Sequence, residues 1–300
     1  MPLFFFLSGL VCNEKKYTWE TFLKSRFNSL VIPYVFFYIV TWLYWLLVEK
    51  RFRPVDLNWW QPLVGMVYGA QWNGLMEHNV ILWFLPCLFV TEVLFFLISR
   101  IEKRRGQFVV VILLACCGFC FKTNFPWGFN IAFVALQFFW VGNMVYRVLE
   151  EHGKTSRQYK LLFCFISLIL IVLYIALSIV LNNKVNMGAN SFGNICIFEL
   201  LSFLGILALV SFFYFLVNRK IGILSWLGRN TLAIYAFHQP ILRIVRFVGV
   251  KYFRFFPVES NIFYALMADI LVVICLIPVV WFYNKYIYKF LNKIYLKYDR

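Results

Sequence analysis

Residues 161–181 read LLFCFISLILIVLYIALSIVL and contain no charged side chain. At 1.5 Å per residue, a helix of about 20 residues crosses the hydrocarbon layer of a bilayer, which is about 30 Å thick. Similar apolar runs recur along the whole sequence, without the alternating polarity of barrel strands. An all-α, polytopic transmembrane bundle is therefore predicted. Eight full spans are expected, near residues 30–48, 79–99, 107–121, 127–147, 160–181, 195–217, 223–248 and 261–283.

The composition excludes a soluble domain. Hydrophobic residues make up 63% of the chain and charged residues 14%, whereas soluble domains are about half apolar and a quarter charged. The net charge of +16 is distributed among the predicted loops, which is typical of orientation signals, so no nucleic-acid partner is expected. Most Lys and Arg residues fall on one side, predicted to be cytoplasmic, and this side includes the C-terminus and a basic tail at 285–300.

The first residues have an unusual pattern. Met1 to Cys12 are apolar but too few to span a bilayer, and no basic leader or cleavage site marks a signal peptide. We interpret them as the second half of a span. Residues 1–300 are predicted to form a single transmembrane domain that is incomplete at its N-terminus.

Ionisable residues inside spans are costly to bury and are the default functional candidates. His238 and Asp269 are predicted to lie at similar depths in neighbouring spans. One hypothesis is a pair in which the carboxylate orients the imidazole as a catalytic base. The alternative is a structural hydrogen bond between helices.

Two further acids lie within predicted spans. Glu92 and Glu199 either line a substrate path or are structural, as ion pairs or as residues that reach the edge of the membrane. Glu92 is also a catalytic candidate, together with His238 and Asp269. Near the cytoplasmic side, Lys24, Arg26 and Arg229 suit an anionic ligand such as phosphate, although positive-inside anchors are the commoner reason for such residues.

The outer segment 49–79 contains Trp59, Trp60, Trp72 and His78. Tryptophans at a membrane surface usually form an interfacial belt. The functional alternative is a vestibule whose aromatic faces contact a sugar or a lipid headgroup. The eight cysteines fall in or beside apolar runs, without the histidines or carboxylates of a metal site, so no metal is expected.

Four motifs occur in a specific order. They are MPLFFFLSG at 1–9, FLKSRFNSLVIPY at 22–34, LWFLPCLFVTE at 82–92 and LSWLGRNTLAIYAFHQPIL at 224–242. Together they resemble the acyltransferase 3 family, and the resemblance covers the whole chain.

The resemblance implies a bacterial inner-membrane enzyme that moves an acyl group, commonly acetyl from acetyl-CoA, to a hydroxyl of a cell-surface carbohydrate or lipid-linked glycan. Lys24 and Arg26 match the basic loop implicated in acyl-CoA use. Trp83 and Glu92 match the helix of the LWFLPCLFVTE motif, and Arg229 and His238 match the motif at 224–242. Packing is the alternative reason for all four residues.

The sequence departs from the family at its front. Members resembling it carry a catalytic histidine on a first span that would precede Met1, so no residue here is predicted to be that base. Two alternatives remain open, namely a transporter or flippase that uses the buried acids, and an inactive truncated family member.

Overall fold

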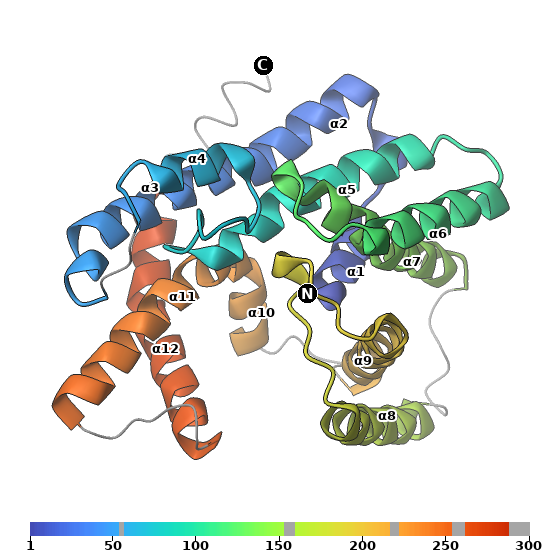
Figure 1. Cartoon of the computed structure of the whole chain (residues 1–300). Coiled ribbons are helices and arrows are strands. Elements are labelled where there is room, and N and C mark those ends of the chain that lie inside the picture. Colours follow the sequence, from blue (N-terminus) through green and yellow to red (C-terminus); the bar gives the residue numbers. More distant parts are fainter. Residues whose placement is uncertain (54–56, 153–159, 217–221, 254–261, 288–300) are drawn as a thin grey trace. The chain divides into compact units, whose positions relative to one another are not determined.

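The computed structural model describes residues 1–53, 57–152, 160–216, 222–253 and 262–287. Every named element in these ranges is a helix, and an isolated bridge between Asn186 and Ser191 is the sole extended pairing among them. The prediction of an all-α chain is confirmed (Figure 1).

Several helices are long and apolar enough to cross a membrane. By length and composition, five helical runs of the described residues qualify, and two shorter apolar helices accompany them. The five are Trp19–Arg51, Val80–Ile98, Pro126–Arg147, Ile195–Phe213 and Ala265–Ile287. The chain is thus an integral membrane protein by its helices, but the predicted count of eight spans is not confirmed.

The predicted span at 223–248 is two helices. Helix α10 covers Gly222–Arg229 and α11 covers Thr231–Val248, with Asn230 between them at φ −107° and ψ 9°. Asn230 Nδ2 donates to Trp226 O (2.7 Å), and Thr231 Oγ1 donates to Leu227 O (3.0 Å). Because these side chains satisfy carbonyls at the end of α10, a helix can end inside an apolar segment.

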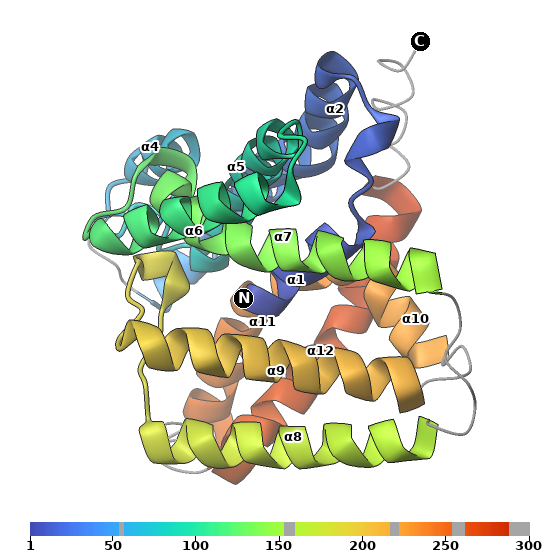
Figure 2. The ribbon, with the colours of Figure 1, turned by 90° about the vertical axis from the view of Figure 1, so that its right-hand side faces the viewer.

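The described chain divides into two compact units. The first contains Met1–Val31, Tyr68–Asn73 and Trp83–Ile221, and the second contains the remainder. Seven helices belong to the first unit, namely α1 (Pro2–Val11), α2 (Trp19–Arg26), α5 (Phe84–Ile98), α6 (Arg104–Cys120), α7 (Phe129–His152), α8 (Lys160–Leu181) and α9 (Ile195–Leu216). Helices α8 and α9 lie side by side (Figure 2).

Helices α1 and α7 approach each other closely through their backbones. A Cβ added to Gly9 would lie 2.0 Å from Phe139 O, and one added to Gly142 would lie 2.0 Å from Phe6 O. Small residues of this kind allow helices to pack tightly where lipid provides no hydrophobic driving force. The two glycines therefore hold the N-terminal helix against α7.

The second unit is organised around α3 (Ile32–Leu47). Its buried tyrosines reach α4 (Gln61–Tyr68), because Tyr34 Oη donates to Met66 O (2.8 Å) and Tyr38 Oη donates to Pro62 O (2.6 Å). The unit also contains the short helix η3 (Glu49–Arg51), α10, α11 and α12 (Ile262–Phe282). Also on α3, Phe37 stacks on Tyr283 (5.5 Å between ring centroids).

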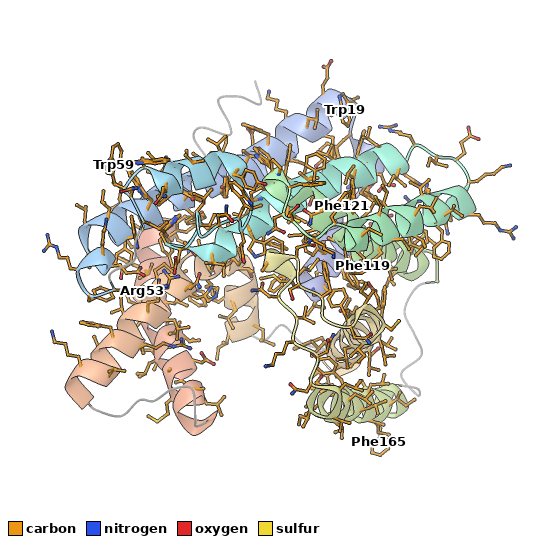
Figure 3. All side chains as sticks on the ribbon, in the orientation of Figure 1. Trp19, Arg53, Trp59, Phe119, Phe121 and Phe165 are labelled. Atoms are coloured by element: carbon orange, nitrogen blue, oxygen red, sulfur yellow. The ribbon has the colours of Figure 1, made fainter. Side chains whose placement is uncertain are left out.

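Large apolar side chains remain on the outside of the helices. Trp19, Trp59 and Phe165 are all exposed, and Figure 3 labels them. A water-soluble protein rarely leaves so many large apolar groups uncovered. These residues are the expected contacts with lipid.

A substitution at the α1–α7 contact should destabilise the protein. Gly142→Leu forces a side chain into the backbone of α1, and overpacking of this kind costs about 1–3 kcal/mol or more. We expect the Tm in detergent to fall by about 5 °C or more. Gly228→Leu is the control, because a Cβ at Gly228 meets nothing within 4 Å. Equal Tm values for the two variants would contradict the contact.

Candidate functional site

Arg26 is placed by the helix that precedes it. Helix α2 begins with a capping box, in which Thr18 N donates to Thr21 Oγ1 (2.9 Å) and Thr21 N donates to Thr18 Oγ1 (3.4 Å). This cap fixes the first turn of α2. Arg26 is the last residue of the same helix. The exposed Lys24 lies on the same turn.

Arg26 forms an ion pair with Glu92 of α5. The Nε and Oε2 atoms lie 2.8 Å apart, although they lack the alignment of a hydrogen bond. Glu92 is buried, whereas the Arg26 side chain is 21% exposed. Two residues that were predicted from separate motifs are thus in direct contact.

Aromatic rings flank the Arg26 guanidinium. Its Cζ atom lies 5.1 Å from the ring centroid of Phe22 and 5.8 Å from that of Tyr17. The Phe22 ring in turn stacks on Phe96 of α5 (4.4 Å). Contacts with ring faces favour a cation, so Arg26 is fixed in a defined orientation with one side open.

The turn that leads into α2 is anchored to α7. Asn143 Nδ2 donates to Cys12 O (2.8 Å) and to Glu14 Oε2 (3.3 Å). Arg147 pairs with the other oxygen of the buried Glu14, and its Nε donates to Asn143 Oδ1 (3.1 Å). These bonds hold the segment before Arg26, and the sequence did not indicate them.

Trp83 and Glu199 make structural contacts in the first unit. Trp83 is buried against Gly188, where an added Cβ would lie 2.5 Å from its Nε1 atom. Gln137 Nε2 donates to Glu199 Oε1 (2.6 Å), which links α7 to α9. A part for either residue in a substrate path stays a prediction.

The described residues show no bond between His238 and Asp269, so a His238–Asp269 pair stays a prediction. His238 Nδ1 lies 2.8 Å from Tyr235 O and 3.3 Å from Ile234 O, both in its own helix. Asp269 is exposed, and the side-chain bonds of the described residues include none between the two. Depth along two helices does not fix how each is rotated about its axis.

Arg229 lies at the end of α10 and is exposed. It belongs to the second unit and Arg26 belongs to the first. A shared role in binding one anion stays a prediction.

The second unit contains a polar cluster around His78. Arg243 Nη1 donates to Glu49 Oε1 (2.9 Å) and to His78 O (2.6 Å), while its Nη2 donates to Glu77 O (2.8 Å). The His78 ring packs edge-on against Tyr38 (4.4 Å). The sequence analysis did not identify Glu49 and Arg243 as site residues. The position of Arg243 inside an apolar segment was the signal that could have identified it.

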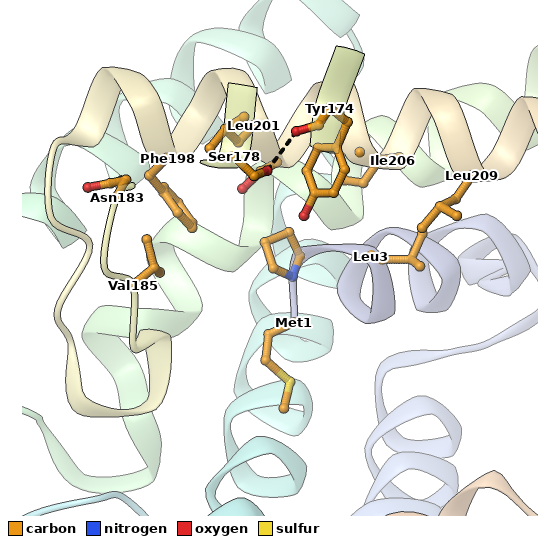
Figure 4. A pocket seen from close by; sticks show the side chains of 13 residues that line it. Met1, Leu3, Tyr174, Ser178, Asn183, Val185, Phe198, Leu201, Ile206 and Leu209 are labelled. Carbon is orange, nitrogen blue, oxygen red and sulfur yellow. Dashed lines mark hydrogen bonds between the residues drawn. The ribbon is translucent and has the colours of Figure 1, made fainter. Parts of the chain in front are cut away.

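One cavity of about 360 Å³ lies in the first unit. Tyr174 and Phe198 face it from α8 and α9, with Met1 on the other side (Figure 4). Ser178 Oγ, beside it, donates to Tyr174 O (2.7 Å). None of the site residues predicted from the sequence lines this cavity.

Replacing Arg26 alone should destabilise the protein more than replacing Arg26 and Glu92 together. Arg26→Met leaves a buried carboxylate without a cation, which costs about 3–5 kcal/mol, whereas Arg26→Met with Glu92→Leu restores an apolar contact. We expect thermal unfolding in detergent to show a low Tm for the single variant and a higher Tm for the double variant. Arg100→Met is the control, because the exposed Arg100 stacks on Phe96. A double variant no more stable than the single one would contradict the pairing.

His78 should make stability depend on pH. Burial, together with the nearby Arg243, lowers the pKa of His78 from 6.5 to about 3. Between these values the unfolded chain binds a proton that the folded protein does not, so stability falls as the pH drops from about 6.5 towards 3.

His78→Phe removes that proton and should flatten the dependence by up to about 1.4 kcal/mol per pH unit. Tm measured between pH 7.5 and pH 4.5 checks this expectation. Parallel curves for the variant and the unsubstituted protein would show that folding does not lower the pKa of His78.

Comparison with known proteins adds one match. The family model of acyltransferase 3, described as an acyltransferase domain, matches residues 1–288 and so covers motifs in both units. No curated protein and no solved structure matches the chain. A match over nearly the full length shows that the chain belongs to the acyltransferase 3 family.

Proposed function

We propose that the chain transfers an acyl group, acetyl in the first instance, from acyl-CoA to a hydroxyl of a cell-surface carbohydrate or lipid-linked glycan. Membership of an acyltransferase family and several apolar helices support a membrane acyltransferase. The proposed setting is the bacterial cytoplasmic membrane, with the C-terminus on the cytoplasmic side. Of the predicted basic tail at 285–300, residues 288–300 lie outside the described residues.

The observation that carries this proposal is the Arg26 site. Its guanidinium is held by Glu92 and two aromatic rings, yet part of the side chain is exposed. Guanidinium groups bind phosphates through paired, charge-assisted hydrogen bonds. Lys24 adds a second cation on the same helical turn. The donor phosphates of acyl-CoA are the anions that this pair would hold.

The reaction itself is an exchange of a thioester for an ester. The acceptor oxygen bonds to the carbonyl carbon, the carbon–sulfur bond breaks, and the thiolate of CoA leaves. The proton lost by the hydroxyl is carried away by a base and finally protonates the thiolate. We assign no residue of the described chain as this base.

Membrane vesicles with radiolabelled acetyl-CoA test the proposal. We expect release of CoA thiol together with label in the glycan fraction, and no release without the protein. Movement of a solute across the vesicle without thiol release would favour the transporter reading. Vesicles with folded protein and neither activity would support the inactive reading.

Arg26→Lys should weaken donor binding while keeping the charge. Lysine retains a partner for Glu92 but lacks the planar fork that binds phosphate oxygens in pairs. We expect KM for acetyl-CoA to rise about tenfold, which corresponds to about 1.4 kcal/mol, with a smaller change in kcat. Arg100→Lys is the matched control, because its guanidinium stacks on Phe96 from an exposed position. An unchanged KM in Arg26→Lys would rule out this role.

A further inference from the structure

The polar cluster of the second unit has more hydrogen-bonding atoms than the described residues satisfy. Glu49 Oε2, Asn79 Oδ1, the Tyr44 hydroxyl and both ring nitrogens of His78 are buried and have no hydrogen-bond partner in the part of the chain that the structure describes. Glu49, His78 and Asn79 are each at most 1% exposed. The fold thus leaves several strong polar groups unsatisfied at one place.

These groups belong to one cluster. A single nitrogen of Arg243 binds both Glu49 Oε1 and the carbonyl of His78, and Asn79 is the next residue. Tyr44 is close enough to interact electrostatically with Glu49 and Arg243. All of them lie in the second unit.

A buried polar group without a partner is expensive. Each one costs about as much as a lost hydrogen bond, and several together are comparable to a large part of the net stability of a domain. Native proteins therefore satisfy such groups, with water or a ligand where the chain does not. Something other than the described residues is expected to bind here.

The chemistry of the unused atoms selects the ligand. The carboxylate and amide oxygens accept hydrogen bonds only, and a neutral imidazole accepts one and donates one. Phosphate or a carboxylate would be repelled by Glu49, whereas hydroxyl groups can donate to all these acceptors. The set favours a neutral molecule with several hydroxyls.

We propose that the Tyr44–Glu49–His78–Asn79 cluster binds the hydroxyl groups of a neutral carbohydrate. The inference rests on the proposed function, because it assigns the acceptor to this cluster. The edge-on contact of His78 with Tyr38 fixes the plane of the imidazole, and the bonds from Arg243 fix its backbone. These contacts hold the ring nitrogens in place before a sugar arrives.

An ion-pair network covers the cluster on its exposed side. Arg53 Nη1 binds Glu49 Oε1 (3.1 Å) and Arg53 Nη2 binds Glu77 Oε1 (3.1 Å). The side chains of Arg53 and Glu77 are 36% and 38% exposed, whereas Glu49 is fully buried. Arg53, labelled in Figure 3, is thus a partly exposed side chain in direct contact with the buried Glu49.

Two substitutions separate binding from packing. Tyr44→Phe and His78→Phe delete polar atoms that bind nothing in the described chain, so packing alone predicts a Tm that is unchanged or higher. If the cluster binds a sugar, both variants should have a lower affinity for the sugar and an unchanged or higher Tm. Tyr34→Phe is the matched control, because Tyr34 does have a partner, the carbonyl of Met66. It should lower the Tm and leave the affinity for sugar unchanged.

The binding experiment uses full-length protein in nanodiscs and the methyl glycosides of glucose, galactose, mannose and N-acetylglucosamine. Tryptophan fluorescence follows each titration. At least one glycoside should bind in the millimolar range, and each phenylalanine variant should weaken that binding about threefold to tenfold. Absence of binding by all four, or equal binding by all variants, would overturn the inference and leave water as the occupant.

The same proteins are assayed for transfer from acetyl-CoA. Transfer that persists with an unchanged acceptor KM in Tyr44→Phe would overturn the carbohydrate site while the proposed function stands. Glycoside binding that depends on Tyr44 and His78, in a protein without acetyl transfer, would support the site and refute the proposed function.

Discussion

Pairing of buried charges determines how the apolar helices of each unit are held together. A charge in an apolar interior is tolerated only beside an opposite charge or a hydrogen-bond partner. Arg26 with Glu92 joins α2 to α5, and Arg147 with Glu14 ties the first turn to α7. Glu49 with Arg243 joins η3 to α11. Apolar side chains can pack about equally well in many arrangements of such helices. The ion pairs therefore favour the arrangement in which the opposite charges meet.

The sequence predicted the fold class because lipid imposes a simple rule. Long apolar runs must become helices, and the composition left no other solution. It also singled out Arg26 and Glu92, one from a basic loop and the other from a buried position in an apolar run. Their contact could not be predicted, because the position of each residue in the sequence does not show which helices become neighbours.

The sequence also did not reveal how each helix is rotated about its axis or where side chains cap a helix end. Ala268, Val272 and Leu276 form the buried face of α12, and Asp269 follows Ala268 by one residue, so it turns away from that face. Glu49 was considered only as the start of the outer segment 49–79, and its burial against Arg243, almost two hundred residues later, was not predicted. Asn230 lies at the end of a helix and binds the carbonyl of Trp226 through its side chain, which hydrophobicity does not reveal.

The proposed function rests on the partial exposure of the Arg26 side chain beside its buried partner Glu92. Arg26 is paired and flanked by rings, yet remains partly exposed, and this combination suits an arriving phosphate. Photoaffinity labelling with an azido derivative of CoA, followed by peptide mapping, tests that account most directly. Labelled peptides should come from residues 17–26 and should disappear when acetyl-CoA competes. Labelling elsewhere, or labelling that acetyl-CoA does not reduce, would contradict a donor site at Arg26.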